Sequence, residues 1–172
     1  MQIKTLQLGE LQTNCYILEK NNEIIIIDPA DNFNEIKKII NNKKVVACLV
    51  THFHLDHIGA LEECLSYYNL NINKLESTNF KMEIIATPGH TNDSQTFYFV
   101  DEKIMFVGDF IFKNGIGRTD LGGNTKDMIE SLKNICSYPD DTKIYPGHGP
   151  ATTLGEEKIH FSNYFWNGFF SV

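Results

Sequence analysis

The sequence predicts a mixed α/β fold, and three observations indicate it. Short apolar runs rich in β-branched residues, such as residues 24–27 and 45–50, are typical of buried strands. Between such runs lie segments whose apolar residues recur at helical spacing. Several predicted strands end in His, Asp and Gly, and strand ends share a sheet edge where ligand sites of α/β proteins gather. We therefore expect sheets flanked by helices, with the chemistry at the strand ends.

Four strands and one helix are predicted in the first third of the chain. The third strand stops at Asp28-Pro29, because proline has no N–H to donate to a ladder. Either Asp31 or Asn32 can cap the helix that follows. The predicted strands are residues 3–8, 14–18, 24–27 and 45–50, and the apolar stripe of the helix is Phe33, Ile36, Ile39 and Ile40.

The remainder alternates between strands and helices. A helix is expected over residues 58–68, whereas the polar segment 69–79 has no pattern that assigns it. A glycine-rich loop surrounds Arg118, and Thr125 is predicted as the N-cap of a helix that turns Met128, Ile129, Leu132 and Cys136 inward. The other predicted elements are strands at residues 80–84, 95–100, 104–107 and 143–145, and a tail, 156–170, that begins as a helix and becomes rich in aromatics.

Length and composition bound the class of protein. The 172 residues, 42% of them hydrophobic, suit one globular domain over residues 1–172. With 15 basic and 22 acidic residues the net charge is −7, and no basic cluster is present, so nucleic acid is disfavoured as a partner. No signal peptide or membrane-length apolar run is visible, and the four cysteines lack C-x-x-C spacing. We expect a cytoplasmic protein with reduced thiols, a small-molecule substrate and no membrane partner, and the oligomeric state stays open.

A histidine-rich motif directly follows the strand at residues 45–50. Three of the six histidines of the chain, His52, His54 and His57, lie within six residues together with Asp56. Imidazoles and a carboxylate at the end of a buried strand are typical metal ligands. The alternative, a polar loop in which the histidines are coincidental, is disfavoured because this pattern seldom arises by chance. The motif predicts a metal site.

Three more donors follow other predicted strands, each beside a glycine that lets the backbone turn sharply: His90, Asp109 and His148. Seven donors are too many for one tetrahedral zinc, so two ions that share a carboxylate are the economical arrangement. The mixture of imidazole and carboxylate suits Zn best, with Fe or Mn as alternatives. Two ions about 3.5–4 Å apart would lower the pKa of a bridging water and yield a hydroxide at neutral pH. No G-x-S-x-G elbow and no G-x-G-x-x-G after a strand are present, which disfavours a serine hydrolase and a dinucleotide site.

The motifs T-H-F-H-L-D-H, T-P-G-H-T, G-D and P-G-H-G, in this order, resemble those of the metallo-β-lactamase superfamily. Within it the chain is most similar to small stand-alone hydrolases of glyoxalase II (hydroxyacylglutathione hydrolase) type. The stretches T-N-C-Y-I-L, I-D-P and G-R-T-D-L also match that group. The resemblance covers nearly the whole chain.

The resemblance implies an αββα sandwich, two sheets face to face with helices outside. Carried over by position, His52, His54 and His90 would hold one ion, Asp56, His57 and His148 the second, and Asp109 would bridge them. Asp56 and Asp109 would be the catalytic carboxylates of a dinuclear hydrolase whose bridging hydroxide attacks a thioester, such as an acylglutathione, or a related small ester.

Other functions stay open. The persulfide dioxygenases share these motifs and the Gly-Arg-Thr-Asp signature yet use one iron. A β-lactamase and a non-catalytic binding protein that kept the fold are further alternatives. The chain also departs from the family's pattern, because the segment between Ile58 and Pro88 is short, Ala30 replaces a glycine, and no helical domain follows for binding glutathione.

Several residues have two readings. Asp28 is either a carboxylate that orients a metal-binding histidine or a turn residue before Pro29, and Arg118 either meets an anionic substrate group or is an ordinary loop arginine. Asp120 is interpreted as a loop residue, Tyr145 as a packing residue and His160 as a histidine on a helix surface.

Overall fold

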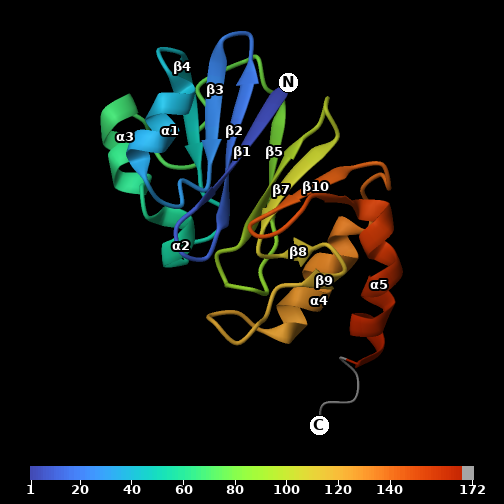
Figure 1. Cartoon of the computed structure of the whole chain (residues 1–172). Coiled ribbons are helices and arrows are strands. Elements are labelled where there is room, and N and C mark those ends of the chain that lie inside the picture. The colour runs from blue at the N-terminus through green and yellow to red at the C-terminus, as the bar shows by residue number, and fades with distance from the viewer. Residues whose placement is uncertain (168–172) are drawn as a thin grey trace. The chain divides into compact units, whose positions relative to one another are not determined.

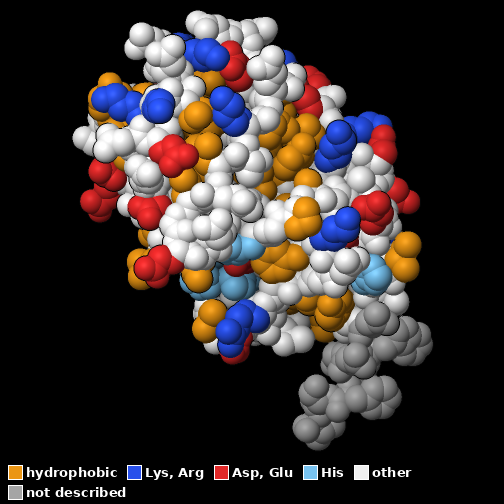
Figure 2. All heavy atoms as spheres, viewed as in Figure 1, with side chains coloured by type: hydrophobic (Ala, Val, Ile, Leu, Met, Phe, Trp, Pro, Cys, Tyr) orange, Lys and Arg blue, Asp and Glu red, His pale blue; other side chains and the backbone are white. Residues whose placement is uncertain are grey.

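A computed structural model describes residues 1–167, and it separates into two compact units, Met1–Lys81 (unit 1) and Met82–Val172 (unit 2). That one domain covers residues 1–172 therefore stays a prediction. Among the described residues, no helix combines the length and the apolar character needed to cross a membrane. Basic and acidic side chains are interspersed over the face that Figure 2 shows. Residues 168–170 of the predicted aromatic tail lie outside the described residues.

Unit 1 is built on a four-stranded sheet in the order β1-β2-β3-β4 (Figure 1). β1 to β3 form an antiparallel meander, whereas β3 and β4 are parallel. A parallel pair needs a crossover connection, and helix α1 supplies it. The strands are β1 (Gln2–Leu8), β2 (Thr13–Lys20), β3 (Glu23–Ile27) and β4 (Lys44–Leu49), and the helix is α1 (Phe33–Ile40).

The core of unit 1 forms on the face of the sheet that α1 and the next helices share. Ile24 and Ile26 alternate on β3 and join one buried cluster with Ile36 and Ile40 of α1. Three cysteines, Cys15, Cys48 and Cys64, lie in the same cluster. All four cysteines of the chain are free thiols, as expected. Burial raises the pKa of the Cys15 thiol, so this group behaves as an apolar packing residue.

Of the helix expected over residues 58–68, only α3 (Leu61–Tyr68) forms, and a separate short helix, α2 (Leu55–Ile58), lies inside the histidine motif. The break follows from two backbone bonds, in which the N–H groups of Gly59 and Ala60 donate to the carbonyls of Ala30 and Pro29, each at 2.9 Å. A side chain at residue 59 would place its Cβ 2.3 Å from the carbonyl oxygen of Ala30. Only glycine permits this approach, and the first turn of the motif is thereby separated from α3.

The segment 69–79, which the sequence leaves unassigned, lies along β4. Ile72 forms an isolated parallel bridge with Cys48, and the N–H of Glu76 donates to the carbonyl of Val46 at 2.9 Å. Its end is fixed to the start of β3, where Ser77 Oγ and Asn79 Nδ2 both donate to the carboxylate of Glu23. Backbone groups at this edge of β4 thus find partners without a regular strand.

Unit 2 contains a five-stranded sheet in the order β11-β10-β7-β6-β5. β7 and β10 are parallel, with α4 in the chain between them, and the other pairs are antiparallel. Three of the strands in unit 2 were not predicted, because two residues are too few to show a period. The elements are β5 (Met82–Ala86), β6 (Gln95–Phe99), β7 (Ile104–Gly108), the hairpin β8 (Ile111–Phe112) with β9 (Gly115–Ile116), α4 (Thr125–Ile135), β10 (Lys143–Pro146), β11 (Thr152–Thr153) and α5 (Leu154–Asn167).

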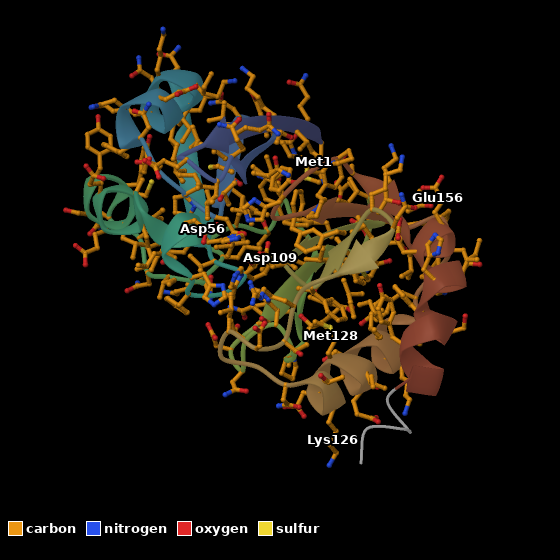
Figure 3. The ribbon with its side chains drawn as sticks, turned by 60° about the horizontal axis from the view of Figure 1, so that its bottom comes forward. Met1, Asp56, Asp109, Lys126, Met128 and Glu156 are labelled. Carbon is orange, nitrogen blue, oxygen red and sulfur yellow. The ribbon has the colours of Figure 1, made fainter. Side chains whose placement is uncertain are left out.

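Helix α4 buries Met128 and Leu132 as predicted, but Ile129 and Cys136 are only partly buried, and Ile135 is fully buried instead. Figure 3 shows Met128 turned toward the sheet of unit 2 and Lys126 turned away from it. The predicted N-cap, Thr125, is wrong by one residue, because the side chain of Asn124 accepts the N–H of Asp127 at 2.9 Å. At α1 the expected side-chain cap does not form, and Asn32 caps that helix without a side-chain bond.

The Glu23 network makes unit 1 sensitive to acid. Hydrogen bonds from Ser77 and Asn79 lower the pKa of Glu23 from 4.5 to about 2. A depressed folded-state pKa stabilises the fold above the unfolded value, and this contribution is lost as the pH falls from 4.5 to about 2. We expect the unfolding free energy of Ser77→Ala to fall less across that pH window than that of the parent. Urea denaturation at several pH values measures this fall. Ser66→Ala, on the exposed side of α3, should show the same fall as the parent. An identical pH dependence in Ser77→Ala and the parent would contradict the assignment.

Candidate metal centre

The histidine motif of unit 1 begins where β4 ends. Thr51 and His52 are buried directly after the strand, His54 is the N-cap of α2, and the first turn of α2 carries Asp56 and His57. Because the helix starts inside the motif, Asp56 lies in a first turn, where negative charge is favoured. The strand end and the short helix together bring all four predicted ligands of unit 1 into one cluster.

A buried carboxylate, Asp28, organises this cluster. Its oxygens accept the backbone N–H of Thr51 at 2.7 Å, the hydroxyl of Thr51 at 2.7 Å and Nδ1–H of His57 at 3.0 Å. Asp28 is only 1% exposed and has a positive φ of 50°, a conformation that Asp tolerates better than most residues. Of its two readings, the geometry favours the one in which Asp28 orients a histidine.

The same bonds set the tautomers of two imidazoles. A carboxylate accepts only, so His57 carries its proton on Nδ1 and presents the Nε2 lone pair. The hydroxyl of Thr51 gives its hydrogen to Asp28 and therefore accepts Nδ1–H of His52 at 3.1 Å. Nε2 of His52 then faces Nδ1 of His54 at 3.1 Å, so these two nitrogens share either a proton or a cation.

Asp56 is positioned by a threonine that the sequence did not single out. Thr13 Oγ1, at the start of β2, donates to Asp56 Oδ2 at 2.8 Å. Asp56 Oδ2 also lies 3.6 Å from His57 Nε2. Two ligands held at about 2.0–2.2 Å from one ion with tetrahedral angles lie roughly 3.3–3.6 Å apart. Asp56 and His57 therefore have the spacing of two ligands of one divalent ion.

Asn73, in the segment along β4, supports the entry to the motif. Its side-chain oxygen accepts the N–H of Val50 at 2.7 Å, and its amide nitrogen donates to the Val50 carbonyl at 3.3 Å. The amide group thus pairs with Val50 as a neighbouring strand would, one residue before Thr51. Unit 1 uses this side chain to hold the backbone that delivers His52.

Unit 2 holds the other three predicted ligands close together. Asp109 Oδ2 lies 3.6 Å from Nε2 of His90 and 3.6 Å from Nε2 of His148. Nδ1–H of His90 donates to the carbonyl of Arg118 at 2.7 Å, which leaves the Nε2 lone pair on the side of Asp109. One carboxylate oxygen facing two imidazole nitrogens is the arrangement that a shared ligand requires. Figure 3 labels Asp109 at the end of β7 and Asp56 on α2.

The loop that provides the Arg118 carbonyl is closely packed. A Cβ at Gly117 would lie 1.8 Å from the Asp109 carbonyl oxygen, so a glycine is required beside the ligand. The Arg118 side chain forms a bidentate pair with Asp120 at 2.6 Å for both bonds, and this pair lowers the pKa of Asp120 to about 2. The pair is exposed, and substrate binding by Arg118 stays a prediction.

Glu157 is a buried carboxylate of unit 2 that the sequence did not single out. It is 1% exposed, accepts the hydroxyl of Thr152 at 2.6 Å, and accepts the N–H of Asn114 at 2.8 Å. Asn114 is in the turn of the β8–β9 hairpin, which leads directly to Gly117 and Arg118. Glu157 lies on a helix within a run of polar residues, so nothing in the sequence marks it.

Tyr145 stacks on Phe106, and His160 is half-buried on α5.

In each unit imidazole nitrogens stand beside a carboxylate oxygen at the spacing of ligands of a divalent ion. Comparison with known proteins identifies the group to which such a set belongs. The family model described as the metallo-beta-lactamase superfamily matches residues 8–72 and 78–148, which is most of the chain. The chain belongs to this superfamily.

Curated members of the superfamily resemble the chain over nearly their whole length. A probable metallo-hydrolase, YqgX of Bacillus subtilis, is 29% identical over 211 residues, covering 98% of this chain and 99% of the relative. The hydroxyacylglutathione hydrolase GloC of Haemophilus influenzae is 30% identical over 206 residues, covering 92% of this chain and 95% of the relative. Both alignments are longer than 172 residues, so the relatives contain residues that this chain lacks. The family match is interrupted at residues 73–77, inside the segment predicted to be short.

Solved structures of superfamily members match the fold. The BLEG-1 B3 metallo-beta-lactamase is similar with a TM-score of 0.86 and 28% identity, covering 95% of this chain and 99% of that one. TTHA1623 in a di-iron-bound form gives a TM-score of 0.80 at 28% identity (90% and 96%), and ETHE1 from Myxococcus xanthus gives 0.81 at 27% identity (94% and 83%). The predicted fold class and superfamily are confirmed, and the chain is a metal-dependent hydrolase of this superfamily that binds divalent ions.

The contact between Asn73 and Val50 can be tested by stability. Asn73→Ala leaves the N–H of Val50 without its side-chain acceptor, and we expect the unfolding free energy to fall by about 1–3 kcal/mol. Asn71→Ala, an exposed asparagine of the same segment, should change it by less than about 0.5 kcal/mol. Chemical denaturation measures both, and equal effects of the two substitutions would show that the Val50 contact is not needed.

The role of Asp28 can be tested by metal affinity. Asp28→Asn keeps the shape and tolerates the positive φ, but it removes the charge that fixes the imidazole of His57, so zinc affinity should fall about 10–100-fold. Competition with a chromophoric chelator measures the affinity, and circular dichroism checks the fold. Asp31→Asn, three residues along the chain, should bind zinc as the parent does. Parental affinity in Asp28→Asn would reject the orienting role.

Proposed function

We propose that the chain is a dinuclear metallohydrolase of glyoxalase II type that cleaves a thioester, such as an acylglutathione, or a related small ester. The observation that carries the proposal is Asp109, whose Oδ2 faces the Nε2 atoms of His90 and His148 at 3.6 Å each. A carboxylate oxygen between two imidazoles suits a ligand shared by two ions. The similarity to hydroxyacylglutathione hydrolase GloC supports the choice of substrate.

The proposed ligand sets are those carried over from the resemblance, with zinc the expected metal. His52, His54 and His90 would hold one ion, Asp56, His57 and His148 the other, and Asp109 both. The tautomers support these roles, since the Asp28 and Arg118 contacts leave the Nε2 atoms of His57 and His90 as donors. Bound ions would supply an activated water and polarise a carbonyl oxygen.

The residues of the chain contribute positioning and charge rather than covalent chemistry. Thr13 and Asp28 fix Asp56 and the imidazoles of unit 1, so little reorganisation accompanies turnover. A thiolate leaves readily at neutral pH, so no acid of the chain has to protonate it. Arg118 is our candidate for an anionic substrate group, with Asp120 holding the guanidinium in place. We further propose a cytoplasmic protein whose partner is its small-molecule substrate, with no nucleic-acid or membrane partner.

A second candidate is oxidation of a persulfide at one iron. The similarity to ETHE1 favours it, together with the Gly-Arg-Thr-Asp sequence at residues 117–120. This candidate requires one metal per chain and oxygen uptake, and thioester hydrolysis requires neither.

The proposal predicts two metals per chain by mass spectrometry and hydrolysis of lactoylglutathione by the zinc-loaded protein. Asp109→Asn should lower kcat/KM by more than about 100-fold, since loss of an outer contact alone costs 10–100-fold. Asp101→Asn, in the turn between β6 and β7, should leave it unchanged.

The outcomes separate the two candidates. One metal per chain with no thioester hydrolysis would reject the dinuclear hydrolase. Oxygen uptake by the iron-loaded protein with glutathione persulfide would then establish the alternative, and absence of uptake would reject it as well. Hydrolysis with an unchanged rate in Asp109→Asn would contradict the shared ligand.

A further inference from the structure

The β8–β9 hairpin and the loop directly after it reach both imidazoles that face Asp109 in unit 2. Arg118 follows β9 by two residues, and its carbonyl accepts Nδ1–H of His90 at 2.7 Å. On the other strand of the hairpin, the ring centroid of Phe112 lies 6.4 Å from that of His148. The position of the hairpin therefore affects both histidines that share the Asp109 oxygen.

The hairpin has little stability of its own. It consists of two residue pairs and forms a two-stranded sheet by itself (Figure 1). A two-stranded hairpin without further support is marginally stable. Lys113 and Asn114 are the central residues of its turn, and of these two only Asn114 has a positive φ, 65°. Two-residue hairpin turns favour a positive φ at the first central residue, so this turn needs support from elsewhere.

A buried carboxylate of α5 supplies that support. Glu157 is 1% exposed, and its Oε2 accepts the N–H of Asn114 at 2.8 Å. Its Oε1 accepts the hydroxyl of Thr152 at 2.6 Å, and Thr152 lies on β11, which pairs with β10. His148 is in the loop between β10 and β11. Glu157 thus joins the turn of the hairpin to the strand that follows His148.

We propose that Glu157 is a positioning residue of the metal centre. By holding the turn, it keeps the Arg118 carbonyl on Nδ1–H of His90, and the Nε2 lone pair of His90 is then available to an ion. A buried carboxylate that lost its donors would be uncompensated, which is costly, so movement of the hairpin away from Glu157 is disfavoured. The role of the metal rests on the proposed function, whereas the tautomer of His90 does not.

The bonds of Glu157 indicate which substitutions should keep the turn in place. Glu157→Met has a similar volume but no acceptor for the N–H of Asn114. Glu157→Gln keeps an acceptor for that N–H. Its amide N–H can donate to Thr152, whose hydroxyl can then donate to Oε2 of Glu156, 2.9 Å away. Glu156→Met, at an exposed position one residue earlier, is the matched control.

The first test follows the tautomer of His90 in the metal-free chain. Long-range ¹H–¹⁵N NMR at mildly alkaline pH distinguishes a proton on Nδ1 of a neutral imidazole from one on Nε2. We expect His90 to carry its proton on Nδ1 in the parent, in Glu157→Gln and in Glu156→Met. In Glu157→Met a measurable fraction should carry it on Nε2. His57, whose Nδ1–H donates to Asp28, should keep its tautomer in every variant.

Hydrogen exchange tests the support of the turn in the parent itself. The amide of Asn114 should exchange at least about tenfold more slowly than that of Lys113 in the same turn, because its N–H is bonded to a buried group. Thr152→Val removes the hydroxyl that orients Glu157, so it should speed the exchange of Asn114 and shift the His90 tautomer in the same direction as Glu157→Met. This variant serves as the test if Glu157→Met does not fold.

Zinc affinity connects the turn to the metal centre. Competition with a chromophoric chelator should show a loss of about tenfold in Glu157→Met, and parental affinity in Glu157→Gln and Glu156→Met. The tautomer is measured without metal or substrate. Absence of thioester hydrolysis would therefore reject the proposed function without changing the result for Glu157.

Several results would overturn the inference. A parental His90 tautomer in Glu157→Met, or equal exchange of Asn114 and Lys113, shows that the turn does not position His90. A shift of both His90 and His57 shows a general disturbance of the fold. A shifted His90 tautomer with parental zinc affinity separates the turn from the metal centre. Loss of affinity in Glu157→Gln shows that the charge, and not the acceptor, is required.

Discussion

The buried carboxylate of Asp28 is the contact on which unit 1 depends. A charged group that is 1% exposed needs compensating donors, and here a backbone N–H, a hydroxyl and an imidazole N–H provide them. Those three donors belong to Thr51 and His57, so satisfying the carboxylate also fixes the end of β4 and the first turn of α2. The positive φ of Asp28 shows that the chain accepts local strain to bring this group inward. Burial of one charge therefore sets the tautomers of the histidines proposed to bind metal.

Unit 2 reaches the same result by a different route. A backbone carbonyl, that of Arg118, accepts Nδ1–H of His90, and the loop that carries it follows a hairpin held by the buried Glu157. In both units a hydrogen-bond acceptor removes the choice of tautomer, and the Nε2 lone pair is left for the proposed ion. The two acceptors are supported differently. The Asp28 carboxylate is a side chain beneath the end of β4, whereas the Arg118 carbonyl is in a loop that Gly117 allows to pack closely.

The sequence predicted the elements that carry a period and the ligands that stand at strand ends. Residues 24–27 and 45–50 are consecutive apolar residues, which is the pattern of a strand buried on both faces, and both segments form buried strands. It did not predict the break at Gly59, which depends on carbonyls of Pro29 and Ala30 far away in the sequence. Thr13 and Glu157 were missed for the same reason, since a polar residue in a strand or helix acquires its role from a partner that only the fold supplies. Two-residue strands carry no period, so β8, β9 and β11 were missed as well.

The short segment after α3 shows how a fold tolerates loss of chain. The relatives align over more residues than this chain has, and the family match breaks at residues 73–77. A strand edge that loses its neighbour would leave backbone groups unsatisfied, which is costly when they are buried. Here the amide of Asn73 replaces a backbone peptide, since it accepts from and donates to Val50, and its positive φ of 54° turns the chain to permit both bonds. Asn73, which completes the edge, is bonded to Val50, the residue directly before the histidine motif. In this short segment the Asn73 side chain thus pairs with Val50 just before the motif, while backbone N–H groups of Asn73 and Glu76 donate to the carbonyls of Cys48 and Val46 on β4.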